Sequence, residues 1–502
     1  MRQRSRQWVI VTCGFILPNL LLFPAFAIGQ VVDLSWGAST SSVAGYNVYR
    51  SATSGGPYTK INSSLVTRTK YTDSNVQAGQ TYYYVTTAVS FSDIESRYSN
   101  QTKAAIPRAG SEIVLYSLAG SGNPKLPYAG LIADKAGNLY GTTALGGAHN
   151  QGTVFELSHN ANWIWTERLL YSFAGGGDGA KPHAALVFDS TGNLYGTTNF
   201  GGNASCSQGC GTVFKLAPGS GDWSESVLYA FTGGSDGREP DARLVFGAHG
   251  NLYGTTLRGG HIDTACTTGC GTVFRLSPGS KGWKESVVYA FEGGKNGALP
   301  YVGVTFDAAG NLYGATYAGG AYGNGTVFKL SPGSSGLWTE GVLHSFTGRP
   351  DGKNPLSDLV LDAAGNLYGT TSQGGNQGEY GVVFELRPNQ TVGWKESVIH
   401  RFANHPSANP MAGLVLDRAG NLYGTTTLGA GLSTCGGGCG TLFKLAPGSS
   451  GRWIYTVLHL FGRATDGFHP SGQLILDRAG NVWGTTQAGG SLGAGTVFQI
   501  IP

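Results

Sequence analysis

Six of the seven cysteines in this chain form three short pairs, which could close disulfides or bind a metal ion. Each pair has three residues between its cysteines and is followed at once by a G-T-V-F-like segment. The pairs are Cys206 and Cys210, Cys266 and Cys270, and Cys435 and Cys439. A metal site would need four ligands from two pairs that meet in space, and the spacing differs from the C-x-x-C of zinc sites. We therefore expect three local disulfides, each stabilising its loop by roughly 2 kcal/mol.

Three histidines recur at one position of the repeat described below, and three histidines could also bind a metal. They are His344, His400 and His459, and the earlier copies carry tyrosine there. Equivalent positions on the outer strands of neighbouring repeats lie too far apart for the roughly 2 Å bonds of a metal site, so we expect no metal. The recurring D-G pairs lack the D-x-D-x-D-G ladder of a calcium loop and predict tight turns. These pairs contain Asp178, Asp236, Asp351 and Asp466. We expect no cofactor.

Carboxylates could serve a different chemistry, because glycoside hydrolases use two Asp or Glu side chains that flank the scissile bond. The candidate acids at the expected binding rim are Asp241, Asp263, Asp358 and Glu379. They come from scattered positions of the chain, and the sequence does not pair them. An enzyme therefore stays an alternative rather than the main interpretation.

The elements that position these residues come from one unit repeated seven times. The stretch D-R-A-G-N-L-Y-G-T-T (417–426) recurs with small changes, and its glycine returns every 55 to 60 residues. The seven glycines are Gly137, Gly192, Gly250, Gly310, Gly365, Gly420 and Gly480. Periods of this size indicate an array, a solenoid or a propeller. A motif present seven times cannot be one catalytic site. We expect its Asp to accept turn N–H bonds, its Gly to take a positive φ and its Tyr to pack between repeats.

Each unit predicts four strands, as in "ALVFD" (185–189), "NLYGTT", "GTVFKLSPG" and "WKESVVYAF" (283–291). Four-stranded units in tandem are typical of β-propeller blades. The repeat region opens with an extra fourth strand, 111–119, and ends on an unpaired third strand, 495–502. Their pairing would complete the last blade and remove two exposed sheet edges. The predicted fold is therefore all-β, with a closed seven-bladed β-propeller over residues 111–502.

The D-x-x-G-N-L-Y motif is similar to the D-x-x-G-x-x-W turn of two-component regulator propellers and, more distantly, to the Asp-box of sialidases. The whole repeat region more closely resembles the secreted bacterial GloVer tandem-repeat family, the choice-of-anchor propellers. This resemblance implies an exported propeller and supplies no activity. Members of that family carry differing surface anchors. No anchor follows "FQIIP" here, so we expect a released protein.

Residues 31–107 predict a separate module of short strands, and this segment resembles a fibronectin type III domain. Trp36 stands where that family buries a core tryptophan, and Tyr82 where it has its corner tyrosine. The segment has no cysteine pair, which also fits the family. The resemblance implies a spacer or adhesive module without chemistry of its own. A short linker, "IPRAGS", leads on to the repeats.

Residues 1–27 predict a secretory signal peptide. Arginines precede an apolar run, and an A-x-A cleavage site ends at Ala27. The alternative is an uncleaved membrane anchor, which Pro18 and Pro24 disfavour because they interrupt the run. No later stretch is long and apolar enough to span a bilayer. Together with the even number of remaining cysteines, this predicts a bacterial protein that is secreted or held in the periplasm or at the cell surface.

Binding should lie where the seven copies differ, since uniform positions serve the fold. The residues just before each first strand vary, and those one and three places after the conserved proline lie on one side of the strand. We expect six of them to ring a channel mouth and bind the ligand: Tyr128, His183, Asp241, Arg243, Tyr301 and Asp358. The alternative is that they are only solvated channel walls. The cysteine pairs would stiffen the neighbouring loops and so reduce the entropy lost on binding.

The net charge of +4 is small for 502 residues and no Lys/Arg run occurs, which argues against nucleic acid as a partner. We predict a monomeric, exported, non-catalytic binding or adhesion protein whose ligand is a glycan or another protein. The alternative is a carbohydrate-active enzyme, a glycoside hydrolase or a polysaccharide lyase, on the same scaffold. A sensor input domain would need a membrane span and a signalling domain, and the sequence predicts neither.

Overall fold

The computed structural model describes residues 32–77, 79–106, 112–119, 124–160, 164–264, 266–334, 336–375, 378–403, 407–429, 435, 438–449, 451–462, 466–478 and 480–502. In these residues the secondary structure is strands, nearly all antiparallel, and three 3-10 turns: η1 (Gly176–Asp178), η2 (Ala248–Gly250) and η3 (Gly294–Asn296). The all-β prediction is confirmed. The predicted signal peptide lies outside the described residues.

The N-terminal module consists of two antiparallel sheets. One pairs β1 (Val32–Ser35) with β4 (Lys70–Asp73). The other has the order β3 (Thr59–Lys60), β2 (Gly45–Ser51), β5 (Thr81–Val89) and β6 (Thr102–Ala105). Trp36 is buried in the core of the module, and the hydroxyl of Tyr82 accepts a hydrogen bond from the N–H of Gln77 at 3.2 Å. This backbone contact a few residues upstream is the tyrosine corner that the resemblance implied.

The repeats form seven successive four-stranded sheets, here called sheets 1 to 7. Sheet 1 is β8 (Ile132–Ala133), β9 (Leu139–Thr143), β10 (Thr153–His159) and β11 (Trp165–Ser172). Sheet 2 is β12 (Val187–Phe188), β13 (Leu194–Thr198), β14 (Thr212–Pro218) and β15 (Trp223–Ala230). Sheet 3 is β16 (Val245–Phe246), β17 (Leu252–Thr256), β18 (Thr272–Gly279) and β19 (Gly282–Ala290). Sheet 4 is β20 (Thr305–Phe306), β21 (Leu312–Thr316), β22 (Thr326–Pro332) and β23 (Trp338–Ser345).

The last three sheets follow the same order with small additions. Sheet 5 is β25 (Val360–Leu361), β26 (Leu367–Gln373), β27 (Val382–Asn389) and β28 (Gly393–Arg401), and β24 (Lys353–Pro355) also pairs with β26. Sheet 6 is β30 (Val415–Leu416), β31 (Leu422–Thr426), β33 (Thr441–Pro447) and β34 (Trp453–Leu460), beside the pair β29 (Ser407–Ala408) and β32 (Leu428–Gly429). Sheet 7 contains β36 (Ile475–Leu476), β37 (Val482–Thr486) and β39 (Gly493–Ile500), with β35 (Gly467–Phe468) and β38 (Ala488–Gly489) at its edge.

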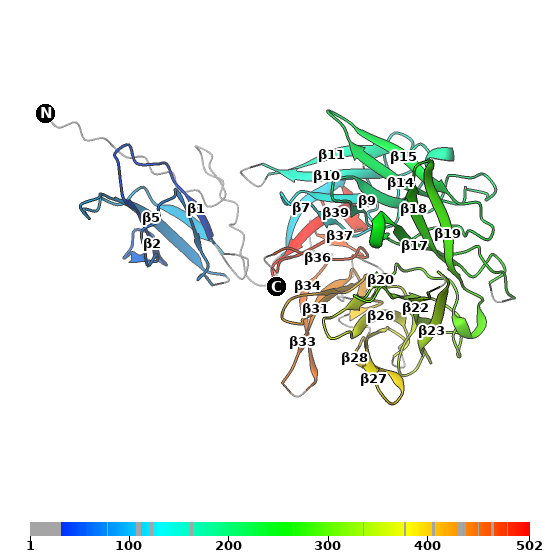
Figure 1. Cartoon of the computed structure of the whole chain (residues 1–502). Helices are drawn as coiled ribbons and strands as arrows, with labels where there is room; N and C mark the ends of the chain where they lie inside the picture. Colours follow the sequence, from blue (N-terminus) through cyan, green and yellow to red (C-terminus); the bar gives the residue numbers. More distant parts are fainter. Residues whose placement is uncertain are drawn as a thin grey trace.

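The fourth strand of sheet 7 comes from the start of the repeat region. Strand β7 (Glu112–Ala119) pairs antiparallel with β39, so that Glu112 lies opposite Ile500 and Tyr116 opposite Val497. Figure 1 shows these two strands side by side although they come from opposite ends of the repeats. The pairing gives β39 a fourth-strand neighbour, as the third strands of the other sheets have, and it covers the edge that β39 would otherwise expose.

Neighbouring sheets pack through the tyrosine of the repeated motif. Tyr140 of sheet 1 contacts Phe188 and Trp223 of sheet 2, with ring centroids 5.1 and 6.3 Å apart. The same contact joins sheet 7 back to sheet 1, where Trp483 packs edge-to-face on Trp165 at 5.6 Å. Each strand-four tryptophan therefore packs on the preceding sheet.

Threonines of the second strands add hydrogen bonds between sheets. Thr142 donates to the carbonyl of Ala184 in sheet 2 at 3.0 Å, and Thr485 of sheet 7 donates to Ala129 of sheet 1 at 3.0 Å. The other donors are Thr197, Thr255, Thr370 and Thr425. Sheet 4 has Ala315 at this position and contributes no such bond. The contacts between sheets thus continue from sheet 7 to sheet 1.

The D-x-x-G-N-L-Y motif acts as a hairpin device, as predicted. In sheet 6, Oδ1 of Asp417 accepts the N–H groups of Ala419 and Asn421, at 2.9 and 2.8 Å. Its Oδ2 accepts the side-chain amide of Asn421 and the hydroxyl of Tyr423. Gly420 has a φ of 83°, which a side chain would strain. These bonds lower the pKa of Asp417 although its partial burial opposes them.

Candidate functional site

All six residues predicted to bind the ligand line one cavity. The cavity has a volume of about 120 Å³, and its lining residues come from all seven sheets. The predicted residues among them are Tyr128, His183, Asp241, Arg243, Tyr301 and Asp358. Each lies between a conserved proline and the first strand of its sheet, which places the start of every sheet around the same opening. The volume is below the roughly 300 Å³ at which pockets begin to enclose a small ligand. The opening can therefore hold one end of a larger ligand.

One side of the cavity is built around Asp241. Its Oδ1 lies 2.8 Å from Nδ1 of His183 and accepts the side-chain amide of Asn199 at 2.9 Å. The ring of Tyr128 packs against the ring of His183 with 5.2 Å between centroids, and Tyr128 is 38% exposed. This side presents an aromatic face next to an oriented imidazole, an arrangement that suits stacking combined with hydrogen bonding.

A second cluster spans three sheets. Arg243 of sheet 3 forms an ion pair with Asp358 of sheet 5, and Asp358 also accepts the N–H of Gly303 from sheet 4 at 2.7 Å. A Cβ atom on Gly303 would lie 3.0 Å from the carbonyl oxygen of Arg243 and 3.2 Å from Asp358. The missing side chain at Gly303 thus lets Arg243 reach across sheet 4. Tyr301 packs on Tyr317 at 5.3 Å, and burial together with Asp241 raises the pKa of Tyr301.

Only two of the four candidate acids line this cavity. Asp241 and Asp358 do so, each tied to a basic partner. Glu379 forms ion pairs with Arg349 and Lys353, and Asp263 accepts the N–H of Thr264 in its own loop. Neither of these two is among the cavity-lining residues. Each of the two carboxylates in the cavity thus lies against a nitrogen of a neighbouring side chain, Asp241 against His183 and Asp358 against Arg243.

Sequence reasoning missed a second set of residues, which do not line the cavity themselves but contact Asp241, Tyr301 and Ser471 of its lining. Asn199 and Tyr317 directly follow the conserved G-T-T or G-A-T of the second strand, and Gln487 at the same position donates to Ser471 at 2.7 Å. The signal was present, because the residue at this position differs from one copy of the motif to the next. The other copies carry Ala144, Leu257, Ser372 and Thr427.

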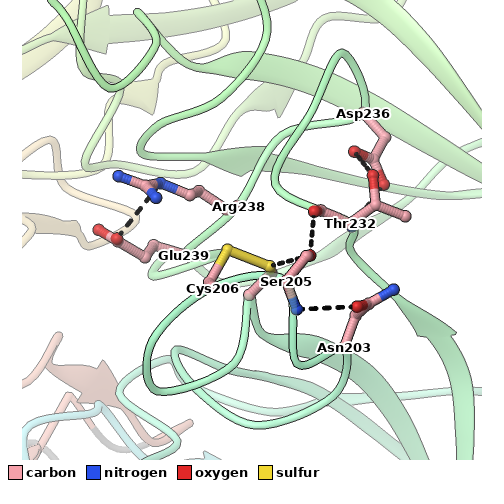
Figure 2. The surroundings of a disulfide bond; sticks show 8 residues. Asn203, Ser205, Cys206, Thr232, Asp236, Arg238 and Glu239 are labelled. Carbon is pink, nitrogen blue, oxygen red and sulfur yellow. Dashed lines mark hydrogen bonds and ion pairs between the residues drawn. A yellow bond between two sulfur atoms is a disulfide. The ribbon is translucent and has the colours of Figure 1, made fainter.

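The three predicted disulfides are present, and they join Cys206 to Cys210, Cys266 to Cys270, and Cys435 to Cys439. Each lies in the loop between the second and third strands of its sheet, as expected. Figure 2 shows the first of them: Ser205 donates to the carbonyl of Thr232, and Thr232 donates to Asp236 at 2.6 Å. The disulfide loop is thereby fastened to the predicted D-G turn of the next connection.

The three histidines on the outer strands do not meet, as predicted. His344 donates to Asp351 at 2.9 Å, and His400 stacks on Tyr455 with 3.9 Å between ring centroids. Burial lowers the pKa of His400 to about 4. His459 instead lies 3.3 Å from Glu112 and 3.4 Å from Asp466. The repeat pattern did not predict this contact of His459 with Glu112 and Asp466.

The described residues contain no helix that is long and apolar enough to cross a membrane. The chain is thus an all-β repeat protein with a fibronectin type III-like module, local disulfides and a cavity at the meeting point of its sheets. The Gloeobacter/Verrucomicrobia repeat matches residues 71–300 and 262–498, and the chain belongs to this family. The family confirms the tandem-repeat resemblance.

Curated relatives match smaller parts of the chain. A stretch of 236 residues is 31% identical to an amylopullulanase from Thermoanaerobacter thermohydrosulfuricus, covering 43% of this chain and 15% of the relative. A stretch of 73 residues is 47% identical to an amylopullulanase from Thermoanaerobacterium saccharolyticum, covering 14% of this chain and 6% of the relative. The chain thus spans a small fraction of the length of these relatives.

Two solved structures are also similar. A Fn3-like protein from Clostridium thermocellum is 41% identical and covers 16% of this chain and 80% of its own, with a TM-score of 0.15. An extracellular domain from B. thetaiotaomicron is 12% identical and covers 93% of this chain and 50% of its own, with a TM-score of 0.45.

Proposed function

We propose that this chain is an exported carbohydrate-binding protein, in which a seven-bladed β-propeller (111–502) follows a fibronectin type III-like module (31–107) and binds its ligand at the cavity mouth. The observation that carries this proposal is the convergence of two side-chain clusters, His183 with Asp241 and Arg243 with Asp358, and the exposed ring of Tyr128 on one opening lined by residues from all seven repeats. Apolar faces with a few placed polar groups are the usual make-up of a small-ligand site.

The propeller reading is supported by the strand pairing of β7 with β39 and by the packing of Trp483 on Trp165. A ring of sheets brings the first strands together at its centre, where the cavity lies. Export is supported by the disulfides, because such bonds persist in oxidising compartments, and by the predicted signal peptide at residues 1–27. We place the protein in the periplasm, at the surface or in the surroundings of a bacterium.

A carbohydrate ligand is supported by the relatives named amylopullulanases. Binding without turnover is supported by the state of the acids, since Asp241 and Asp358 are both held by basic partners. The second candidate function is a carbohydrate-active enzyme, favoured by the presence of these two carboxylates in one cavity.

The test is a panel of polysaccharides that includes amylose and pullulan, offered to purified protein of residues 28–502. Retention on a glycan without release of reducing ends or unsaturated sugars after overnight incubation is the expected result. If the wild type releases sugar products and Asp241→Asn or Asp358→Asn does not, the protein is a carbohydrate-active enzyme rather than a binding protein. Failure of every glycan to bind would contradict the carbohydrate ligand and direct the search to a protein partner.

A further inference from the structure

A partly buried group of three potential metal ligands lies where the repeat region closes. Glu112 is on β7, His459 is on β34, and Asp466 directly precedes β35. One donor atom from each residue lies within 4.8 Å of the other two. In the described part of the chain, this is the one set of three His, Cys, Asp or Glu side chains that meets in this way.

The separations suit an ion between the side chains. Nε2 of His459 lies 3.3 Å from Oε2 of Glu112 and 3.4 Å from Oδ2 of Asp466. Donors bound at about 2.0–2.1 Å to a tetrahedral zinc ion lie roughly 3.3–3.4 Å from one another. A direct N–H···O hydrogen bond is shorter, about 2.7–3.2 Å. The observed spacing is therefore compatible with coordination of one ion by all three residues.

The same three residue types occur between sheets 4 and 5 with a different geometry. There His344 donates directly to Asp351 at 2.9 Å, and Glu396 is the glutamate on the neighbouring outer strand. In sheet 2, tyrosine replaces the histidine, and Tyr229 donates to Asp236 at 2.9 Å. The repeat can thus close this contact by a hydrogen bond, and the group at Glu112 departs from that pattern.

A bound cation would offset the cost of burying the negative charge of Glu112. The side chain of Glu112 is only 4% exposed, and neither of its oxygens has a hydrogen-bond partner in the described residues. A buried carboxylate without compensation is costly, and a bound cation would keep it ionised. The side chains of His459 and Asp466 are 14% and 17% exposed, which leaves room for a water molecule as the fourth ligand.

We propose that Glu112, His459 and Asp466 bind a zinc ion that fastens β7 to the neighbouring outer strand. One imidazole and two carboxylates are ligands that zinc accepts, whereas calcium and magnesium prefer oxygen ligands alone. The ligands come from both ends of the repeat region, so the ion would stabilise its closure. This site is independent of the cavity and of the proposed carbohydrate ligand.

The test uses metal-free protein of residues 28–502 titrated with zinc chloride, with calorimetry for stoichiometry and scanning calorimetry for the Tm. We expect one zinc ion per chain and a raised Tm. His459→Tyr places the residue of the earlier sheets at this position and should keep the fold, while both effects disappear. Glu112→Gln should weaken zinc binding at least tenfold. The control His344→Tyr should bind zinc as the wild type does.

Cobalt(II), used in place of zinc, gives a second readout. A four-coordinate cobalt site absorbs visible light, whereas three side chains that only stabilise the fold would produce no such absorption. Wild type and His344→Tyr should show this absorption, and His459→Tyr should not. The proposal is wrong if zinc leaves the Tm of the wild type unchanged, or if His459→Tyr and Glu112→Gln bind zinc as tightly as the wild type.

Discussion

The hydroxyl of Thr485 donates a hydrogen bond to the carbonyl oxygen of Ala129, 3.0 Å away and 356 positions earlier in the chain. This bond repeats, between sheet 7 and sheet 1, the contact that Thr142 makes from sheet 1 to sheet 2. The two ends of the repeat region therefore meet by the same chemistry that joins neighbouring repeats.

The register of β7 on β39 can be tested with a disulfide. Ile113 lies opposite Gln499, and directly opposed residues of an antiparallel pair have Cβ atoms roughly 4.5–5.5 Å apart. Ile113→Cys with Gln499→Cys should therefore oxidise to a bond within one chain, detected by mass spectrometry of the linked peptides. Ile113→Cys with Val497→Cys is two residues out of register and should link poorly. Linkage between two chains would show that β7 pairs with a neighbouring molecule instead.

The repeated Asp should stabilise its hairpin through the bonds that it accepts. Asp417→Ala removes four such hydrogen bonds and leaves the N–H groups of Ala419 and Asn421 without their acceptor. We expect a loss of about 2 kcal/mol and a lower Tm in scanning calorimetry. The neighbouring Arg418 is exposed and takes no part in these four bonds, so Arg418→Ala is the matched control. An equal loss in both variants would contradict the role given to Asp417.

Buried glutamates of the outer strands should make the stability fall as the pH rises. Burial raises the pKa of Glu225, Glu285 and Glu340 to about 7 from the ordinary value of 4.5, with nearby acids adding to the shift. A group whose pKa is raised on folding contributes stability that is complete below the unfolded pKa and is lost as the pH rises through about 7. The Tm should therefore fall between about pH 5 and pH 8.

Glu285→Gln should lessen that fall, because an amide does not ionise. Glu379→Gln is the matched control: Lys353 lowers the pKa of Glu379, so this change should leave the fall between pH 5 and pH 8 in place. A Tm that depends on pH identically in the wild type and in Glu285→Gln would show that Glu285 is not held protonated by the fold.

Positions within the repeat could be predicted from the sequence, whereas contacts between distant copies could not. The place of Asp241 and Tyr301 at the cavity follows from their position after the conserved proline, since every copy places that residue alike. The interaction partners of the cavity residues could not be predicted in this way. Arg243 reaches Asp358 two sheets away only because Gly303 between them has no side chain. A repeat pattern contains no information about such a crossing.

The contacts that join the two ends of the repeat region could likewise be predicted only in part. The unpaired strands at the two ends of the repeats predicted the pairing of β7 with β39, because only one partner was available for each. Strand β7 has no tryptophan, whereas the fourth strands of the other sheets pack one on the motif aromatic residue of the preceding sheet, as Trp223 does on Tyr140. The meeting of Glu112 with His459 depends on the exact rotation between two sheets, which the spacing of motifs does not define.

The most direct test of the account compares binding isotherms of the wild type and of the triple variant Asp241→Ala, Arg243→Ala, Tyr301→Ala with pullulan. Asp263→Ala, which lies outside the cavity-lining residues, serves as the control, and circular dichroism checks that all three proteins are folded. The account predicts that the wild type and the control bind without cleavage and that the triple variant loses at least tenfold in affinity. Unchanged binding by the folded triple variant would contradict the cavity mouth as the ligand site.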